Sequence, residues 1–250
     1  MAEFTGKVAI VTGGSSGIGR AAAVMFAQRG AKVVVAARRI PQSEETVKMI
    51  KDAGGEGMFV QTDVRVASMV ENMVKKTVEK YGRLDVAFNN AGKAGVFQPL
   101  TEETEEAFYE QIDTNLKGVW LCMKYEIPEM LKVGGGAIVN NASITGLRAL
   151  RKLNSYSASK HGVVGITNSA AKEYAPKNIR IVAICPGWTQ TEMTPEFTVD
   201  PARKAITEKQ IPLHRIARPE DIAELACFLA SDRANFIAGG AIAISGGLDI

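Results

Sequence analysis

Short apolar runs alternate with longer segments of helical periodicity along the whole chain. The apolar runs are nearly continuous, as strands are when helices cover both faces of their sheet. Strands are predicted at residues 8–12, 32–37, 58–61, 84–89, 137–140, 180–184 and 241–244. Helices are predicted at residues 17–28, 42–53, 67–81, 104–131, 155–174 and 219–230, with a shorter one near 201–209. This alternation predicts an α/β fold with a doubly wound parallel sheet and right-handed crossovers.

Size and composition favour one ordinary globular domain. The chain has 250 residues, of which 46% are hydrophobic and 23% charged. Neither a repeat nor a Pro/Ser-rich linker divides it, so residues 1–250 are predicted to form a single domain. The formal net charge is +3, and no dense Lys/Arg run favours nucleic acid. No signal-peptide pattern or membrane-length apolar run is present, so we expect no membrane contact.

Cysteine and histidine usage argues against a metal site. The three cysteines, Cys122, Cys185 and Cys227, lie far apart in the sequence, and the chain has only two histidines. None of these residues has a familiar metal-ligand spacing. Reduced thiols are typical of the cytoplasm, which is the expected location.

A glycine-rich stretch follows the first predicted strand and opens the first helix. It reads T-G-G-S-S-G-I-G, from Thr12 to Gly19. In this context Gly13 would allow a tight turn, Gly17 would let the backbone approach a pyrophosphate, and Gly19 would let helix and strand pack closely. The N–H groups at the helix start would face the phosphates. A simple tight connection is the alternative, but the pattern favours dinucleotide binding.

The end of the second predicted strand bears on which dinucleotide is bound. A carboxylate here would hold the adenosine 2′-hydroxyl of NAD, yet the position is Ala37. Arg38 and Arg39 follow directly, and a guanidinium binds a 2′-phosphate well. NADP(H) is therefore the predicted cofactor, with NAD as the alternative. The two arginines could instead be ordinary solvated charges.

Polar residues at other strand ends are candidates for the same site. Asp63 could accept a hydrogen bond from adenine or could cap the following helix. Asn89 and Asn90 end the fourth predicted strand, at the sheet edge where ligands bind. Asn115 lies inside the long helical pattern, where asparagine is unfavourable. It could be a tolerated polar residue, or it could break a backbone hydrogen bond and free a carbonyl for water.

The chemistry is predicted to centre on Tyr156 and Lys160. Residues four apart share one face of a helix. A cation ~4 Å from the phenol would favour the phenolate by ~4 kcal/mol at an effective dielectric of ~20, which lowers the pKa by ~3 units. Such a group can act as a general acid or base near pH 7. Ser143 follows a predicted strand and would reach the same sheet edge, although an exposed i, i+4 pair is the alternative for the two helical residues.

Taken together, these residues closely resemble the short-chain dehydrogenase/reductase family, in its compact form of roughly 250 residues. The matching pieces occur in the family's order along the whole chain. They are T-G-G-S-S-G-I-G, Asp63, N-N-A-G at residues 89–92, Asn115, Ser143, Y-S-A-S-K at residues 156–160, and P-G-W-T-Q-T at residues 186–191. The resemblance implies a single Rossmann-like domain, a seven-stranded sheet with helices on both faces, and a homotetramer built as a dimer of dimers.

The resemblance also implies a role for each matching residue. Tyr156 would be the general acid in reduction and the general base in oxidation, and Ser143 would steady the substrate oxygen. Lys160 would lower the pKa of the tyrosine and hold the nicotinamide ribose, while Asn115 would keep a water that links Lys160 to solvent. The residues implied to bind the cofactor are Gly13, Ser15, Ser16, Gly17, Ile18, Gly19, Arg38, Arg39, Asp63, Val64, Asn90, Ala91, Gly92, Tyr156, Lys160, Pro186, Gly187, Thr189 and Thr191.

Substrate contacts are expected from three places: residues 147–153, Trp188, and a proline-containing lid at residues 190–212. Arg148, Arg151 and Lys152 cluster just before Tyr156. Solvated surface charge is the ordinary interpretation of such a cluster. Contact with an acidic substrate or a carrier protein is the alternative.

The predicted function is NADP(H)-dependent interconversion of a ketone and a secondary alcohol, a small-molecule reaction. A 3-oxoacyl-[acyl-carrier-protein] reductase and an NAD-dependent alcohol or sugar dehydrogenase are alternatives with the same chemistry. A dinucleotide-binding regulator without turnover is a third class, but it would not need the set of Asn115, Ser143, Tyr156 and Lys160. A sugar-nucleotide epimerase is disfavoured because little chain remains for a substrate domain.

Overall fold

All seven strands are parallel and form one sheet, in the order β3-β2-β1-β4-β5-β6-β7. The computed structural model describes residues 2–193, 195 and 200–248. The strands are β1 Val8–Thr12, β2 Lys32–Ala37, β3 Glu56–Gln61, β4 Val86–Asn89, β5 Gly136–Asn141, β6 Ile179–Pro186 and β7 Ala241–Ile244. The predicted Rossmann-like α/β class with a doubly wound, seven-stranded parallel sheet is confirmed.

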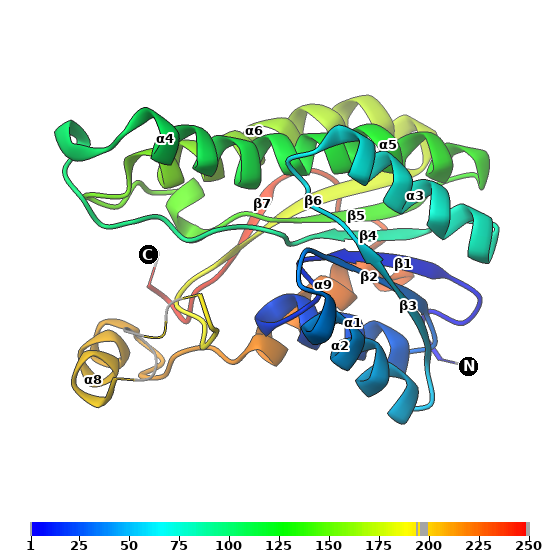
Figure 1. The fold of residues 1–250 in the computed structure, drawn as a ribbon, viewed down its shortest axis with the longest axis horizontal. Helices are drawn as coiled ribbons and strands as arrows, with labels where there is room; N and C mark the ends of the chain where they lie inside the picture. Colours follow the sequence, from blue (N-terminus) through cyan, green and yellow to red (C-terminus); the bar gives the residue numbers. More distant parts are fainter. Residues whose placement is uncertain (1, 194, 196–199, 249–250) are drawn as a thin grey trace.

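Helices cover both faces of the sheet (Figure 1). On one face lie α3, α4, α5 and α6, and on the other lie α1, α2 and α9, whereas α8 stands apart from both layers. Their bounds are α1 Gly17–Gln28, α2 Ile40–Asp52, α3 Ala67–Tyr81, α4 Glu105–Gln111, α5 Gly118–Lys132, α6 Asn154–Tyr174, α8 Pro201–Gln210 and α9 Pro219–Ala230. Short 3-10 turns lie at Leu100–Glu102, Ile144–Gly146, Ala175–Lys177 and Asp232–Ala234.

The two helical layers bury two apolar clusters, one on each side of the sheet. Successive residues of a strand point to opposite faces, so β1 supplies Ala9 and Val11 to one cluster and Ile10 to the other. All five β1 residues are buried. Burial on both faces explains why the central strands appear in the sequence as continuous apolar runs.

One predicted helix is interrupted in the structure. The pattern at residues 104–131 forms α4, then a π-helical segment at Ile112–Lys117, then α5. The π-helical segment contains Asn115, where the sequence suggested a broken backbone bond. Smaller differences lie at strand ends: β3 begins two residues earlier than predicted, and β6 extends to Pro186. Of the predicted lid, residues 194 and 196–199 lie outside the described residues.

The strand order places a ligand site between β1 and β4. From β1 the chain proceeds outward to β2 and β3, and it then returns to the other side of β1 as β4. The loops after β1 and β4 therefore diverge, which leaves a crevice at the carboxyl ends of the strands.

Candidate active site

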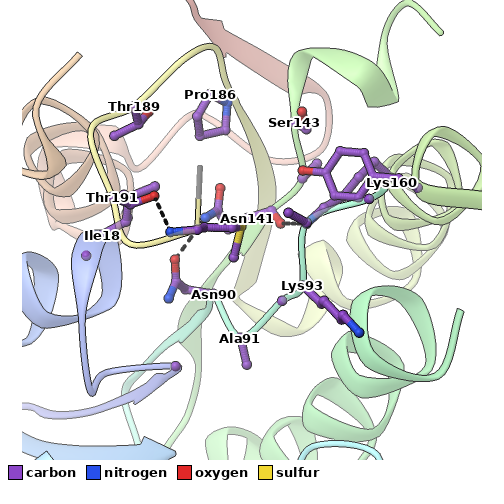
Figure 2. Close-up of a pocket in the computed structure, with 18 of the residues that line it drawn as sticks. Ile18, Asn90, Ala91, Lys93, Asn141, Ser143, Lys160, Pro186, Thr189 and Thr191 are labelled. Carbon is purple, nitrogen blue, oxygen red and sulfur yellow. Dashed lines mark hydrogen bonds between the residues drawn. The ribbon is translucent and has the colours of Figure 1, made fainter. Parts of the chain in front are cut away.

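A cleft of about 1010 Å³ lies at the carboxyl ends of the strands. Loops that follow β1 to β6 contribute to its lining, and they bring together the predicted cofactor and catalytic residues (Figure 2). Every predicted site residue lines this cleft except Gly19 and Asn115, which lie behind the lining. The volume is at the upper end of the range of roughly 300–1,000 Å³ that is usual for small-molecule sites.

The glycine turn has the geometry that the sequence predicted. Gly13 and Gly17 have positive φ angles of 66° and 50°, a backbone conformation that favours glycine. The helix α1 begins at Gly17, so its free N–H groups face the cleft. A Cβ atom at Gly19 would lie 2.6 Å from Nδ2 of Asn90 and would also strike the carbonyl oxygen of Gly13. The turn and the loop after β4 therefore pack together without room for a side chain between them, and the cradle fits a dinucleotide phosphate.

Thr12 joins this turn to the loop after β4. Its Oγ1 accepts hydrogen bonds from the backbone N–H groups of Asn90 and Ala91, both 3.0 Å long. Its carbonyl oxygen accepts a further hydrogen bond of 3.0 Å from Nδ2 of Asn90. Nδ2 of Asn141, at the end of β5, donates to Oδ1 of Asn90 over 2.9 Å, as Figure 2 shows. Sequence analysis did not assign Thr12 and Asn141 to the site, although both are polar residues at strand ends.

The two arginines after β2 occupy different environments. Arg39 donates to Oγ of Ser15 and of Ser16, at 3.2 and 2.6 Å, and pairs with Oε2 of Glu192 at 3.0 Å. Arg38 lines the cleft and is exposed. Within the described part of the chain, its guanidinium has no carboxylate partner. Arg38 is therefore the freer of the two cations, and Arg39 already links the glycine turn to the start of the predicted lid.

Asp63 and Val64 lie where adenine would be expected from the sequence, along the cleft after β3. The Asp63 carboxylate accepts hydrogen bonds from Nε and Nη2 of Arg65, the shortest being 2.6 Å long. The hydrogen bonds from Arg65 are the main reason that the pKa of Asp63 is lowered, so this carboxylate stays ionised. An adenine amino group would therefore meet a negatively charged acceptor here.

Ser143, Tyr156 and Lys160 meet at the other end of the cleft. Tyr156 and Lys160 lie on α6, and Nζ of Lys160 is 5.7 Å from the centre of the tyrosine ring. Nζ donates to the carbonyl oxygen of Asn141 over 2.9 Å, and Figure 2 shows this bond beside Ser143. Ser143 is buried, and its Oγ accepts from the backbone N–H of Thr145 over 3.2 Å. The hydroxyl of Ser143 is near enough to the phenol of Tyr156 to favour its ionised form and so to lower its pKa.

The pKa of Tyr156 shifts in the direction opposite to the predicted one, because burial outweighs the opposing interactions. Burial raises the pKa of Tyr156 above its ordinary value, and the hydrogen bond with Ser143 only partly opposes this effect. Burial also lowers the pKa of Lys160 to about 8. The predicted lowering supposed a cation ~4 Å from the phenol at an effective dielectric of ~20 and left out the cost of burial. In the structure both groups are buried, and the ammonium donates to the carbonyl oxygen of Asn141. The phenol is therefore protonated at neutral pH, next to a lysine that is still largely charged.

Asn115 is fully buried and organises the loop after β4. Its Oδ1 accepts from the N–H of Lys93 over 2.8 Å, and its Nδ2 donates to Oε1 of Gln111 over 2.8 Å and to the carbonyl oxygen of Lys93 over 3.1 Å. A longer contact of 3.3 Å reaches Oγ of Ser159, one residue before Lys160. The side chain thus holds the backbone on both sides of Lys93, which explains why a π-helical segment is tolerated here.

The segment after β6 closes the cleft over the glycine turn. The N–H of Gly187 donates to the carbonyl oxygen of Ile244 over 3.0 Å, and the N–H of Gln190 donates to that of Ala217 over 2.9 Å. A Cβ atom at Gly17 would lie 3.1 Å from Cγ2 of Thr191. Residues 186–191, which include four of the residues implied to bind the cofactor, therefore lie opposite the glycine turn.

The rest of the described chain adds no metal or membrane feature. None of its helices combines the length and apolar character needed to span a bilayer. Across residues 2–193, 195 and 200–248 no three His, Cys, Asp or Glu side chains converge as metal ligands. All three cysteines are buried free thiols.

The chain is similar to known proteins along nearly its full length. A family model described as "Enoyl-(Acyl carrier protein) reductase" matches residues 13–249. A short chain dehydrogenase/reductase of Aspergillus oryzae is 39% identical over 254 residues, covering 99% of this chain and 97% of that protein. A cyclohexanol dehydrogenase of Acinetobacter is 38% identical over 244 residues, covering 98% and 95%.

Two further comparisons bear on the site. A cis-4-hydroxycyclohexanecarboxylate dehydrogenase of Sinomonas cyclohexanicum is 39% identical over 244 residues, covering 98% of this chain and 97% of that protein. The crystal structure of a levodione reductase superposes with a TM-score of 0.95 at 34% identity, covering 98% of both chains. The family match, the strand order and the dinucleotide cleft agree, and the chain belongs to the short-chain dehydrogenase/reductase family of oxidoreductases, which bind a nicotinamide dinucleotide and act on CH–OH groups.

Proposed function

We propose that this protein interconverts a ketone and a secondary alcohol with NADP(H), and that Tyr156 is the general acid in reduction and the general base in oxidation. The observation that carries the proposal is the shared cleft. Its lining includes the glycine turn at one end and Tyr156, Ser143 and Lys160 at the other. The nicotinamide supplies or accepts the hydride when it is bound. The protein positions the substrate and moves the proton.

Burial of the phenol supports the acid role of Tyr156. A phenol whose pKa is raised by burial keeps its proton at neutral pH and has it ready for a developing alkoxide. Lys160 lies on the same helix face, and its charge would stabilise the phenolate that forms as the proton leaves. Ser143 would donate to the same substrate oxygen, so both hydrogen bonds would strengthen as negative charge develops there.

Arg38 supports NADP(H) over NAD. Its guanidinium lies at the cleft beyond Ala37, and the strand end offers no carboxylate for a ribose hydroxyl. Asp63 also lines the cleft, and it is already paired with Arg65. A 2′-phosphate would therefore meet an available cation, with Arg39 and the Ser15 and Ser16 hydroxyls beside it.

We also propose that residues 1–250 act as one catalytic domain in the cytoplasm, with residues 190–212 as a lid. The Arg39–Glu192 ion pair supports the lid, because it links the start of that segment to the glycine turn. The described residues of the segment include α8, which stands apart from the main layers (Figure 1). The buried free thiols of Cys122, Cys185 and Cys227 are in keeping with a reducing location.

Exposed apolar side chains support the expected homotetramer. Phe108, Tyr109 and Trp120 on α4 and α5 are 41%, 58% and 48% exposed, and Phe236 is fully exposed. Two glycines of α6, Gly162 and Gly165, lie in different environments. A Cβ at Gly162 would collide with Leu116 of the same chain, whereas Gly165 has open space around it. Light scattering tests the assembly, and a monodisperse monomer would exclude it.

The decisive experiment compares Tyr156→Phe with Tyr174→Phe. The second change removes the same hydroxyl from the same helix, at a position outside the cleft. Nicotinamide absorbance should be followed with a panel of ketones, β-ketoacyl thioesters and sugars, using both cofactors. We expect Tyr156→Phe to bind NADPH like the wild type and to lose roughly 10²–10⁴-fold in kcat, while Tyr174→Phe retains its rate.

The same panel separates the alternatives. Turnover confined to acyl-carrier thioesters would indicate a 3-oxoacyl-[acyl-carrier-protein] reductase. Cofactor binding without turnover on any substrate would indicate a dinucleotide-binding regulator. Substantial kcat in Tyr156→Phe would remove that residue from the proposed role.

A further inference from the structure

We infer that the substrate carries a carboxylate on a compact apolar body, and that Arg148 and Arg151 recognise this carboxylate at the mouth of the cleft. The inference rests on the proposed function, since it names the substrate class of the same site. It concerns the turn between the 3-10 helix at Ile144–Gly146 and α6, directly before Tyr156.

The charges that line the cleft are unbalanced. Six cationic residues line it, namely Arg38, Arg39, Lys93, Arg148, Arg151 and Lys160, but only two acidic ones, Asp63 and Glu192. Both acids are already engaged, Asp63 by Arg65 and Glu192 by Arg39. Lys93 pairs with Glu110, and Lys160 donates to a carbonyl. Among the described residues that line the cleft, the cations left without a partner are therefore Arg38 at one end and Arg148 and Arg151 at the other.

Arg148 and Arg151 have no counter-charge of their own. Both are exposed and line the cleft, and among the described residues neither forms an ion pair or a side-chain hydrogen bond. Two neighbouring guanidinium groups repel each other and together attract an anion. A carboxylate fits the planar donor fork of arginine in a bidentate manner.

The turn that carries these arginines is held at both ends. The N–H of Arg148 donates to the carbonyl oxygen of Ile144 over 2.9 Å, and that of Leu153 donates to Leu150 over 3.2 Å. The carbonyl oxygen of Lys152 accepts from the N–H of Gln98 over 3.0 Å. Lys152 has a φ of 68°, which costs a non-glycine residue about 1 kcal/mol or more. The backbone is therefore fixed in a shape that sets the two arginines at the cleft.

Apolar side chains line the same cleft as the arginines and Tyr156. They include Phe97, Leu150, Leu153, Trp188 and Met193. Hydrocarbon would be buried against these walls, while the ketone reaches Ser143 and Tyr156 and the carboxylate stays at the mouth. The cleft thus suits a cyclic or short-chain oxo acid and the corresponding hydroxy acid. The phosphates of an acyl thioester carrier are the other source of an anion here, and the experiment below separates the two.

The first test compares oxo acids with their methyl esters in the NADPH-loaded enzyme. The pairs are 4-oxocyclohexanecarboxylate and 4-oxopentanoate, each with its uncharged ester. The double variant R148Q/R151Q is compared with K76Q/K80Q, which removes the same charge from the exposed face of α3 outside the cleft. We expect R148Q/R151Q to lower kcat/KM for the acids by roughly 10- to 100-fold, mainly through KM, with the esters changed less than about threefold.

A binding measurement makes this test independent of turnover. Cyclohexanecarboxylate should bind the NADP⁺-loaded wild type in a calorimeter, and binding should weaken by the same factor in R148Q/R151Q but not in K76Q/K80Q. One outcome would overturn the proposed function and leave this inference standing. In that outcome R148Q/R151Q alone loses binding of the carboxylate, while neither the wild type nor the two variants reduce any ketone. Acids and esters reduced equally by the wild type and by R148Q/R151Q would overturn the inference and leave the proposed function standing.

The thioester arm decides the source of the anion. Acetoacetyl-CoA and the short analogue acetoacetyl-N-acetylcysteamine differ in carrier phosphates. If R148Q/R151Q impairs only reduction of the CoA thioester, the arginines bind the carrier and the carboxylate assignment is wrong.

Discussion

Glu126 and Asn89 form a hydrogen bond in the interior, with 3.0 Å between Oε2 of Glu126 and Nδ2 of Asn89. Glu126 is fully buried on α5, and Asn89 is the last residue of β4, directly before the loop that lines the cleft. Nδ2 of Asn89 also donates to Oδ1 of Asn140 over 3.0 Å. Oε1 of Glu126 and Oδ1 of Asn89 are both buried without a partner among the described residues. Both of these oxygens are acceptors, so the arrangement lacks a hydrogen-bond donor. A protonated Glu126 would supply one through its O–H group.

Glu126→Gln should change how stability depends on pH. Burial is the main cause that raises the pKa of Glu126 from 4.5 to about 7. Between these values the folded protein binds more protons than the unfolded chain, so the free energy of unfolding falls as pH rises. Above pH 7 the free energy of unfolding has fallen by about 3 kcal/mol in total. Glutamine has the same shape as glutamic acid but does not titrate. Above about pH 7 the variant should therefore have a larger free energy of unfolding than the wild type, which urea unfolding from pH 5 to 8 would measure.

The difference between wild type and variant isolates this one group from the other titrations. The thiol of Cys122 lies beside Glu126, but burial raises its pKa well above this range, so it does not titrate here. Parallel stability curves for the two proteins would mean that Glu126 has an ordinary pKa, and the proposed protonated state would be wrong.

The double change Ala37→Asp with Arg38→Leu should reverse cofactor preference. The new carboxylate would repel a 2′-phosphate and accept from ribose hydroxyls, and the available cation at the cleft would be lost. We expect the ratio of kcat/KM for NADPH over NADH to fall by roughly 10- to 100-fold. An unchanged ratio, in a variant whose circular dichroism is normal, would refute the role of Arg38.

Gly19→Ala should abolish dinucleotide binding. The added methyl group would lie 2.6 Å from Nδ2 of Asn90 and would strike backbone at Gly13. Relieving this overlap would move the turn and cost about 1–3 kcal/mol in stability. Gly165→Ala on α6 is the matched control, because the position has open space and alanine favours a helix by up to ~1 kcal/mol. Equal NADPH affinity in the two variants, measured by fluorescence titration, would contradict the predicted close packing.

Asn115→Ala should loosen the loop after β4. It would leave the N–H and carbonyl groups of Lys93 without their side-chain partner, at a cost of about 1–3 kcal/mol. Because this loop continues to the cleft, we expect kcat to fall together with stability. Asn72→Ala on α3, outside the cleft, serves as the control. If the two variants have the same kcat and the same free energy of unfolding, Asn115 does not organise the loop.

The sequence predicted most helices and strands, because a strand that is buried on both faces of the sheet appears as a continuous apolar run. Continuous apolar runs locate β1 and β2 within their observed bounds, and the glycine turn follows from the spacing of its glycines between a strand and a helix. The break in the helix at residues 104–131 could not be placed from the sequence. It depends on hydrogen bonds between Asn115 in the π-helical segment and Lys93 in the loop after β4. Sequence indicates a misplaced asparagine, but it does not indicate the partner.

The sequence indicated many of the residues that line the cleft, but it did not indicate the electrostatics of the cleft. The pKa of Tyr156 is raised mainly by burial, and the spacing of Tyr156 and Lys160 in the sequence does not show how deeply they are buried. The pairing of Arg39 with Glu192 joins residues 153 positions apart, so no local pattern signals it. Thr12 was overlooked because the two hydrogen bonds to its hydroxyl come from backbone N–H groups, whose positions appear only in the folded chain.

The parallel sheet gives the enzyme two regions that can change independently. Loops after β1, β2 and β3 line the part of the cleft proposed to hold adenosine, whereas the turn at residues 147–153 and the segment after β6 line the part proposed to hold the ketone. A mutation in that turn would then alter what is reduced without touching the residues proposed to hold the coenzyme. The range of substrates can in this way change through a few surface side chains, while the glycine turn keeps its shape.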